Sequence, residues 1–261
     1  MGEVYVGDAF SCTHRAHASV EALPRMMAVA TAGRALGQEL TALHRALADP
    51  QRPVAAVVGG AKVSTKLQVL ENLVGRVDAL VLGGGMANTF LLADGQNVGA
   101  SLVEADMVDT ARAIRARADE HGCQILLPDD FLVADQLAPG VAHRVASCGD
   151  VSAGEMILDA GPASAEAAVA FLGGCRTVVW NGPMGAFEVP PFDSATNRVA
   201  SAVAELTVAG RMMSVAGGGD TLAALANAGV SDQFSYVSTA GGAFLEWLEG
   251  RDLPGVEALR R

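Results

Sequence analysis

Two lysines and the glycines that precede them are the residues of this sequence best suited to chemistry. The turn Gly59-Gly60-Ala61-Lys62 follows the apolar run Val54–Val58, and Lys66 comes four residues after Lys62. Glycines let backbone N–H groups approach an anion closely, and each lysine adds a positive charge. The turn lacks the G-x-x-x-x-G-K-[ST] spacing of a P-loop. It indicates a different phosphate-binding turn with both lysines on one face of the following helix; the alternative is two solvated surface lysines.

A second glycine-rich turn, Gly217-Gly218-Gly219-Asp220-Thr221, follows the apolar run Met212–Ala216. The N-terminus of a helix attracts anions through its free N–H groups and its dipole. Asp220 has two interpretations that the spacing alone does not separate. It either caps the helix that begins here, or it holds Mg²⁺, which takes one or two carboxylates together with phosphate oxygens.

Three other segments have the composition of ligand-binding loops. Thr239-Ala240-Gly241-Gly242 opens a short helix and is another candidate anion cradle. The stretch 180–188 is too irregular to start a helix, and its Glu188 either accepts hydrogen bonds from a ribose or faces solvent. His14-Arg15-Ala16-His17 has too few neighbouring ligands for a metal site. We expect Arg15 to bind a carboxylate or phosphate bidentately.

Several classes of protein do not fit the sequence. The G-x-G-x-x-G turn of a dehydrogenase and the G-x-S-x-G elbow of a serine hydrolase are both missing. The four cysteines are scattered without C-x-x-C spacing, which argues against a zinc or redox site. The net charge of −11 argues against nucleic acid as a partner. Without an apolar run long enough for a bilayer or a signal segment, we expect a soluble, cytoplasmic protein that does not bind membranes.

The elements that must position these turns follow one repeated pattern. A short apolar run ends in a turn rich in Gly, Asn or Asp, and a helical pattern follows. The runs are Val54–Val58, Ala79–Leu82, Gln124–Leu127, Thr177–Trp180 and Met212–Ala216. Uninterrupted apolar runs are typical of parallel strands that are buried on both faces. The sequence therefore predicts an α/β fold with a three-layer doubly wound parallel (Rossmann-like) sheet, whose glycine-rich turns meet at the carboxyl ends of the strands.

Helical periodicity supports this alternation. Leu36, Leu40, Leu43 and Leu47 fall on one face of a helix, and the helix near residue 111 has a similar apolar face. Residues 1–24 fit the predicted domain poorly, because the strand-like Val4-Tyr5-Val6 has no earlier strand to pair with. We expect the edge of this strand to be exposed and the chain to begin within a fold.

Taken together, these segments closely resemble phosphoglycerate kinase from about residue 4 to the C-terminus, in the order of that family. The matching stretches are Asp8-Ala9-Phe10, His14–Ser19, Gly59–Val63 with Lys66, Gly83–Ala87, Leu127-Pro128 with Asp130, Gly161-Pro162, Trp180–Gly185, Gly217–Thr221, Val237–Thr239, Leu248–Gly250 and Leu253–Val256. The family is a two-domain kinase that moves a phosphoryl group between ATP and the carboxylate of 3-phosphoglycerate. Its N-terminal domain holds the acid and its C-terminal domain holds the Mg-nucleotide.

The resemblance implies a role for each matching residue. Lys62 and Lys66 would contact the nucleotide phosphates or the transferred phosphoryl group, which Gly241 and Gly242 would help to cradle. Arg15 would bind the acid substrate, and Asp220 would hold Mg²⁺. The residues implied to bind ATP or ADP are Gly60, Ala61, Lys66, Gly83, Gly84, Asn181, Pro183, Glu188, Gly217, Gly218, Gly219, Asp220 and Thr221.

The same resemblance implies a domain organisation. Residues 1–30 would be a remnant of the acid-binding domain, 31–50 an interdomain helix, 51–238 the nucleotide-binding domain, and 239–261 a helix and tail that return toward the first domain. The full-length form is expected to be a monomer. Gly7, Ala195, Tyr236 and Ala240 depart from the family pattern, and Ala240 would be strained if its backbone required a positive φ. The alternative function is an inactive, stand-alone nucleotide-binding module.

Overall fold

The core of the molecule is a six-stranded parallel sheet. The structure is a computed structural model, and it describes residues 2–260. The strands lie in the order β11-β10-β9-β3-β4-β5, and each neighbouring pair is parallel. Their bounds are β3 Val54–Gly59, β4 Ala79–Gly83, β5 Gln124–Leu126, β9 Thr177–Asn181, β10 Met213–Gly217 and β11 Tyr236–Ser238.

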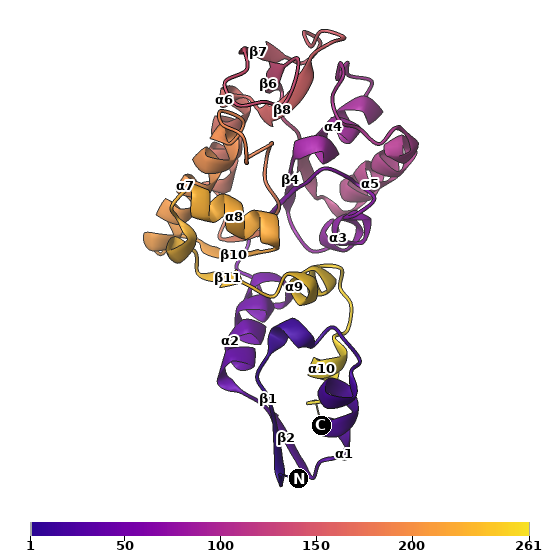
Figure 1. Ribbon diagram of the computed structural model, residues 1–261, viewed down its shortest axis with the longest axis vertical. Helices are drawn as coiled ribbons and strands as arrows, with labels where there is room; N and C mark the ends of the chain where they lie inside the picture. Colours follow the sequence, from indigo (N-terminus) through magenta and orange to yellow (C-terminus); the bar gives the residue numbers. More distant parts are fainter. Residues whose placement is uncertain (1, 261) are drawn as a thin grey trace.

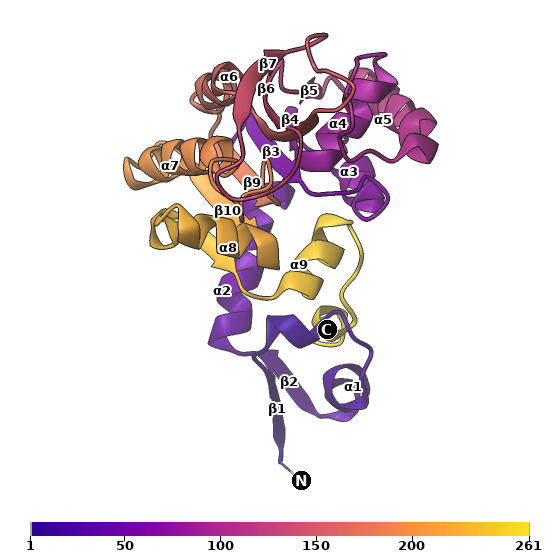
Figure 2. The ribbon, with the colours of Figure 1, turned by 45° about the horizontal axis from the view of Figure 1, so that its top comes forward.

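Helices cover both faces of this sheet (Figure 2). Val54, Ala56 and Val58 of β3 belong to one hydrophobic core, and Ala55 and Val57 belong to the other. The first core is closed by α2 Arg34–Leu43, α3 Leu67–Leu73, α4 Gly84–Ala93, α5 Val108–His121 and α9 Gly241–Leu248. The second is closed by α6 Pro162–Leu172, α7 Ser194–Val208 and α8 Gly219–Asn227. The predicted three-layer α/β fold is confirmed, because apolar residues on both faces of a strand require helices on both sides.

A three-stranded antiparallel sheet was not predicted. It has the order β7-β6-β8, with β6 Asp130–Ala134, β7 His143–Ser147 and β8 Met156–Ala160. This sheet stands beside α4 above the carboxyl ends of the parallel strands (Figure 1). Its last strand thereby reaches the edge of the parallel sheet at which the glycine-rich turns lie.

A smaller lobe lies at the opposite end of the molecule (Figure 1). The strands β1 Val4–Gly7 and β2 Val29–Ala32 form a two-stranded parallel sheet. The strand β1 therefore has a partner, because β2 pairs with it from later in the chain. The side chains of Val4 and Val6 are nevertheless 52% and 56% exposed, in agreement with the exposed edge expected for this strand. Around it lie the short helices η1 Phe10–Cys12, η2 Ala18–Ala22, α1 Leu23–Met26 and α10 Pro254–Glu257.

The helix α2 connects the two lobes. It continues directly as the π-helix η3 His44–Ala48. The helix that was predicted over residues 31–50 therefore covers residues 34–48, and the strand β2 precedes it. Leu36, Leu43 and Leu47 are buried as predicted, and Leu40 packs against the same core. The buried Glu39 carboxylate of α2 accepts hydrogen bonds from the hydroxyls of Tyr236 and Ser238, which fixes the helix to β11. Burial and the neighbouring Glu39 raise the pKa of Tyr236.

The remaining short helices are η4 Ala105–Met107 and η5 Ser231–Gln233. Within residues 2–260, none of the helices combines the length and the apolar character that crossing a membrane requires.

Candidate functional site

The glycine-rich turns that follow β3, β4, β9 and β10 are bonded to one another. The Gly84 N–H donates to the Met184 carbonyl at 2.8 Å, and the Met86 N–H donates to the Gly60 carbonyl at 2.9 Å. The Asn181 side-chain amide donates to the Gly217 carbonyl at 2.7 Å. Parallel strands present their carboxyl ends at one edge of the sheet, which is why turns distant in the sequence meet here.

These contacts need residues without a side chain. A Cβ atom on Gly59 would lie 1.7 Å from the Pro183 carbonyl oxygen, and one on Gly182 would lie 2.1 Å from the Gly59 oxygen. Gly182 also has a φ of 108°, which residues with a side chain rarely adopt. The backbones of the first and third turns are therefore in direct contact.

The first cavity has a volume of about 270 Å³ and mostly apolar walls. Its lining comes from the turns after β3, β4 and β9, from the antiparallel sheet, and from three loops. The lining residues are Gly60, Ala61, Gly84, Gly85, Ala87, Asn88, Leu102, Pro128, Leu137, Met156, Ile157, Leu158, Asp159, Ala160, Pro183, Met184, Gly185, Ala186, Phe187, Glu188 and Asp220. Glycines on one side and aliphatic side chains on the other make a space suited to a flat, largely apolar group.

Asp159 is a buried carboxyl in the wall of this cavity. It accepts hydrogen bonds from the N–H groups of Ala160 at 3.0 Å and Ala195 at 2.9 Å, and the second of these lies in the first turn of α7. Burial raises the pKa of the Asp159 carboxyl well above its ordinary value, although the two N–H groups oppose this shift. A Cβ atom on Gly185 would lie 2.2 Å from the carboxyl oxygen, so only a residue without a side chain can pack against Asp159 here.

The second cavity has a volume of about 240 Å³ and is lined mainly by glycines and by four polar side chains. The lining residues are Lys66, Asn181, Gly182, Gly218, Gly219, Asp220, Thr221, Gly241, Gly242 and Leu245. The first residues of α8 and α9 lie here, so the N-termini of two helices and a lysine share one cavity. Free N–H groups, two helix dipoles and a positive charge together favour an anion. Asp220 lines both cavities, which therefore adjoin each other.

Lys66 is held in place by Asn181. Its Nζ donates to the Asn181 carbonyl at 3.0 Å and also to the Asn181 side-chain oxygen. Burial lowers the pKa of Lys66 to about 8, and the nearby Asp220 carboxylate partly offsets this shift. The Thr221 hydroxyl is buried and accepts a hydrogen bond from the Gly182 N–H at 2.7 Å, which ties α8 to the loop after β9.

One expectation about local geometry is wrong, and two points that the sequence left open have an answer in the structure. Lys62 and Lys66 do not share a helical face, because residues 63–66 form a turn and α3 begins only at Leu67. Asp220 does not cap α8, because the cap residue is Gly218 with a φ of 100°. Ala240 has a φ of −94°, so its backbone needs no positive φ and the added methyl group causes no strain of that kind.

Four of the residues expected in the site line neither cavity. Lys62 is exposed in the loop between β3 and α3, and Arg15 is exposed in the small lobe. Gly83 packs against Met184 and Gly217 packs against Phe244, so both lie behind the walls. The other expected residues are brought together, and the ring of His14 comes close to Gly242. The roles of all these residues remain predictions.

The sequence did not point to the apolar wall of the first cavity. Leu102, Leu137 and Leu158 come from loops and from the unpredicted sheet, where no periodic pattern marks them. Asp159 carries the one signal that could have been used, since it is a carboxylate near the end of an apolar run and just before Gly161-Pro162. Among residues 2–260, no three His, Cys, Asp or Glu side chains are placed to hold a metal ion by themselves.

A doubly wound sheet with an apolar slot beside an anion-attracting cavity at its carboxyl edge defines the class of α/β proteins that bind phosphorylated ligands there. The family model for phosphoglycerate kinase matches residues 1–251. This chain therefore belongs to the phosphoglycerate kinase family.

Known proteins agree with this assignment. The phosphoglycerate kinase of Azorhizobium caulinodans is 62% identical over 261 residues, which are 100% of this chain and 66% of that protein. That of Rhodospirillum centenum is 61% identical over 259 residues, or 99% of this chain and 65% of that protein. The structure of phosphoglycerate kinase from Coxiella burnetii matches with a TM-score of 0.95 and 46% identity, over 98% of this chain and 65% of the other. The chain thus spans just under two thirds of the length of these relatives.

Proposed function

We propose that the two adjoining cavities form the Mg-nucleotide site of a phosphoglycerate kinase. The base and ribose of ATP or ADP would occupy the first cavity, with the exposed Glu188 beside the ribose. The phosphates would occupy the second cavity, between Lys66 and the first turns of α8 and α9. The observation that carries the proposal is that the first cavity, which is mostly apolar, adjoins the second cavity, which favours an anion, and that Asp220 lines both.

The chemistry of Asp220 fits Mg²⁺. A single exposed carboxylate at the mouth of the phosphate cavity matches the way in which Mg²⁺ combines one protein carboxylate with phosphate oxygens and waters. When bound, the ion would neutralise part of the charge on the phosphates. Asp220 would hold it, and Thr221 would keep the first turn of α8 in position through its bond to Gly182.

The proposed reaction is the reversible transfer of a phosphoryl group between ATP and the carboxylate of 3-phosphoglycerate, as in glycolysis. Such a transfer needs positioning and charge stabilisation rather than a covalent nucleophile. Lys66 would place its positive charge on the phosphates, since Asn181 fixes its ammonium group. The N–H groups of Gly241 and Gly242 would receive the transferring group. Lys62, which is exposed, would reach the phosphates only after movement of its side chain.

The domain organisation is part of this proposal. The small lobe would belong to the acid-binding domain, with Arg15 as a ligand of the acid. The helix α2 would be the interdomain helix, and α9 and α10 would return the chain to the small lobe, as their contacts with η1 and η2 suggest. We place this activity in the cytoplasm. The high identity to full-length kinases supports the kinase over an inactive module.

A chimera tests the proposed reaction. The N-terminal third of the Azorhizobium caulinodans relative, joined ahead of this chain, should give ATP-dependent phosphorylation of 3-phosphoglycerate. Lys66→Ala and Asp220→Ala should each lower kcat/KM by about a hundredfold, because each removes a charge at the transferring group. Arg117→Ala, an exposed change on α5, is the matched control and should have no effect. A folded chimera whose turnover survives Lys66→Ala would contradict the proposal.

A further inference from the structure

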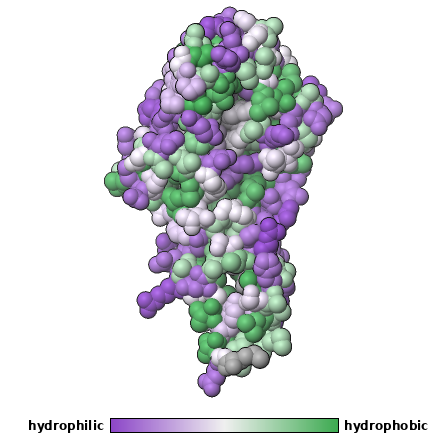
Figure 3. All heavy atoms as spheres, viewed as in Figure 1, coloured by the Kyte–Doolittle hydropathy of each residue, from purple (hydrophilic) through white to green (hydrophobic). Residues whose placement is uncertain are grey.

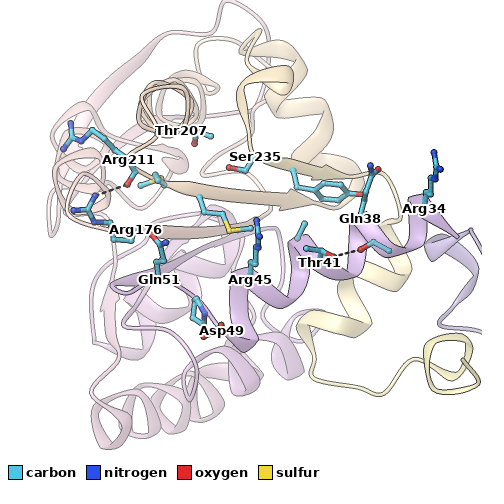
Figure 4. A pocket seen from close by; sticks show the side chains of 17 residues that line it. Arg34, Gln38, Thr41, Arg45, Asp49, Gln51, Arg176, Thr207, Arg211 and Ser235 are labelled. Carbon is cyan, nitrogen blue, oxygen red and sulfur yellow. Dashed lines mark hydrogen bonds between the residues drawn. The ribbon is translucent and has the colours of Figure 1, made fainter. Parts of the chain in front are cut away.

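A large hollow of the molecule lies away from the proposed nucleotide site. It is a groove of about 1310 Å³ between α2 with η3 on one side and the beginnings of β10 and β11 on the other (Figure 4). Met213 and Tyr236 stand at the amino ends of these strands, whereas the nucleotide cavities lie at the carboxyl ends. The groove and the nucleotide site therefore occupy opposite edges of the same sheet.

Four exposed arginines line this groove: Arg34, Arg45, Arg176 and Arg211. Eight other arginines within residues 2–260 form ion pairs with carboxylates. None of the four in the groove does so with any residue in that part of the chain. Four arginines without ion pairs that gather in one groove of a protein with a net charge of −11 point to an external anion.

The four charges form a row. Figure 4 shows Arg34 at one end of the groove, Arg45 near its middle, and Arg176 with Arg211 at the other end. Arg176 Nη1 donates to the Arg211 carbonyl at 3.4 Å, which keeps the last two together. Asp49 is the one acidic residue in the lining, so positive charges outnumber negative ones four to one.

The size and the lining of the groove indicate an extended ligand. Its volume exceeds the range of roughly 300–1,000 Å³ that is usual for small-molecule sites. The side-chain amides of Gln38 and Gln51 have no bonding partner within the described residues and can bond to peptide groups. Met213 contributes an apolar surface between the charged ends. Arg34 and Arg45 are about 16 Å apart along a helix, a distance that about five residues of extended peptide span.

We propose that this groove binds an extended, carboxylate-rich peptide segment of a partner protein. The guanidinium group of an arginine can form two parallel hydrogen bonds with one carboxylate. The side-chain amides of Gln38 and Gln51 can form hydrogen bonds with the N–H and carbonyl groups of a peptide backbone. A nucleic acid fits less well, because its continuous line of phosphates would be repelled by the acidic remainder of the molecule. Since the groove lies on the edge opposite to the nucleotide cavities, partner and nucleotide can be bound at the same time.

Fluorescence anisotropy of a labelled hexaglutamate peptide tests this proposal on the full chain. We expect saturable binding at low ionic strength that weakens as salt is added. Arg45→Gln and the double change Arg176→Gln with Arg211→Gln should each weaken binding by about tenfold, the effect of losing a charge-assisted hydrogen bond. Arg117→Gln is the matched control, since Arg117 is also exposed, lies outside the groove and lacks an ion pair within the described residues, and it should bind as the wild type does.

Three results would overturn the proposal. The first is unchanged affinity in the double variant when circular dichroism shows that it is folded. The second is equal binding of a hexaglutamine peptide, which would remove the role of charge. The third is tighter binding of inorganic polyphosphate or an RNA hexamer than of hexaglutamate, which would assign the groove to phosphate polymers. The test is independent of the nucleotide site, so the failure of one proposal leaves the other untouched.

Discussion

Lys66 is the residue on which the proposed site depends most. Burial lowers the pKa of Lys66 from its ordinary value of 10.5 to about 8, so the ammonium group loses its proton at a much lower pH than an exposed lysine does. We predict that the affinity for ADP falls as the pH rises through about 8. Lys66→Arg keeps its charge at these pH values, so its affinity should stay level across the same range. Calorimetric titrations from neutral to alkaline pH compare the two profiles, and parallel profiles would contradict the assignment.

The same shift has a consequence for stability. The unfolded chain holds the Lys66 proton up to about 10.5 and the folded chain only up to about 8, so the unfolded state binds more protons in this window. The contribution of Lys66 to the free energy of unfolding therefore increases as the pH rises through it. Bound phosphates would oppose this effect by favouring the charged form.

A second prediction concerns the Thr221 hydroxyl. Thr221→Val should lower the free energy of unfolding by about 1–3 kcal/mol, because the buried Gly182 N–H would lose its acceptor. Thr41→Val is the control, since the exposed Thr41 hydroxyl only donates to the Gly37 carbonyl on its own helix, and the change should stay within about 0.5 kcal/mol. Denaturant unfolding measures the free energy of unfolding of the two variants. Equal losses in Thr221→Val and Thr41→Val would contradict a stabilising role of the hydrogen bond from Gly182 to Thr221.

At the scale of elements, the close approach of β3 to the loop after β9 should tolerate no side chain. Gly59→Ala would place a methyl group 1.7 Å from the Pro183 oxygen, and we predict a loss of about 3 kcal/mol in the free energy of unfolding. Gly37→Ala is the matched control, because it lies in α2 with no atom within 4 Å of the added Cβ. It should instead stabilise the chain by about 0.5–1 kcal/mol. A Gly59→Ala chain as stable as the wild type would contradict the described contact.

The elements also show what could be predicted from the sequence. The five strands that end in turns rich in Gly, Asn or Asp were found because an uninterrupted apolar run such as Val54–Val58 has few alternatives to a buried parallel strand. The antiparallel sheet was missed because β7 exposes most of its residues and shows no comparable run. The helix expected at Lys62 begins only at Leu67, because the Lys66 N–H bonds to the Val63 carbonyl in a turn. Local turn geometry of this kind has no periodic signature.

At the scale of the whole molecule, the two lobes should differ in stability. A two-stranded sheet is marginal by itself, and β1 and β2 leave Val4, Val6 and Val29 about half exposed. Figure 3 shows apolar side chains on the surface of this end of the molecule. By contrast, every residue of β3 is buried. The small lobe therefore has less buried apolar surface to hold it together.

We predict that the amides of Val4–Gly7 exchange with solvent much faster than those of Val54–Gly59, because local opening requires less free energy where few apolar contacts are lost. Hydrogen exchange followed by mass spectrometry compares the two segments in one experiment. Equal protection would mean that the chain unfolds as a single cooperative unit.

Calorimetric titration of ADP into this chain, with and without Mg²⁺, tests the central claim most directly. We predict saturable binding of ADP that becomes tighter when Mg²⁺ is present. Lys66→Ala should weaken this binding with or without Mg²⁺, and Asp220→Ala should remove the effect of Mg²⁺. Arg117→Ala should bind as the wild type does. A folded chain that binds no ADP, or one whose binding ignores both Lys66→Ala and Asp220→Ala, would contradict the nucleotide site.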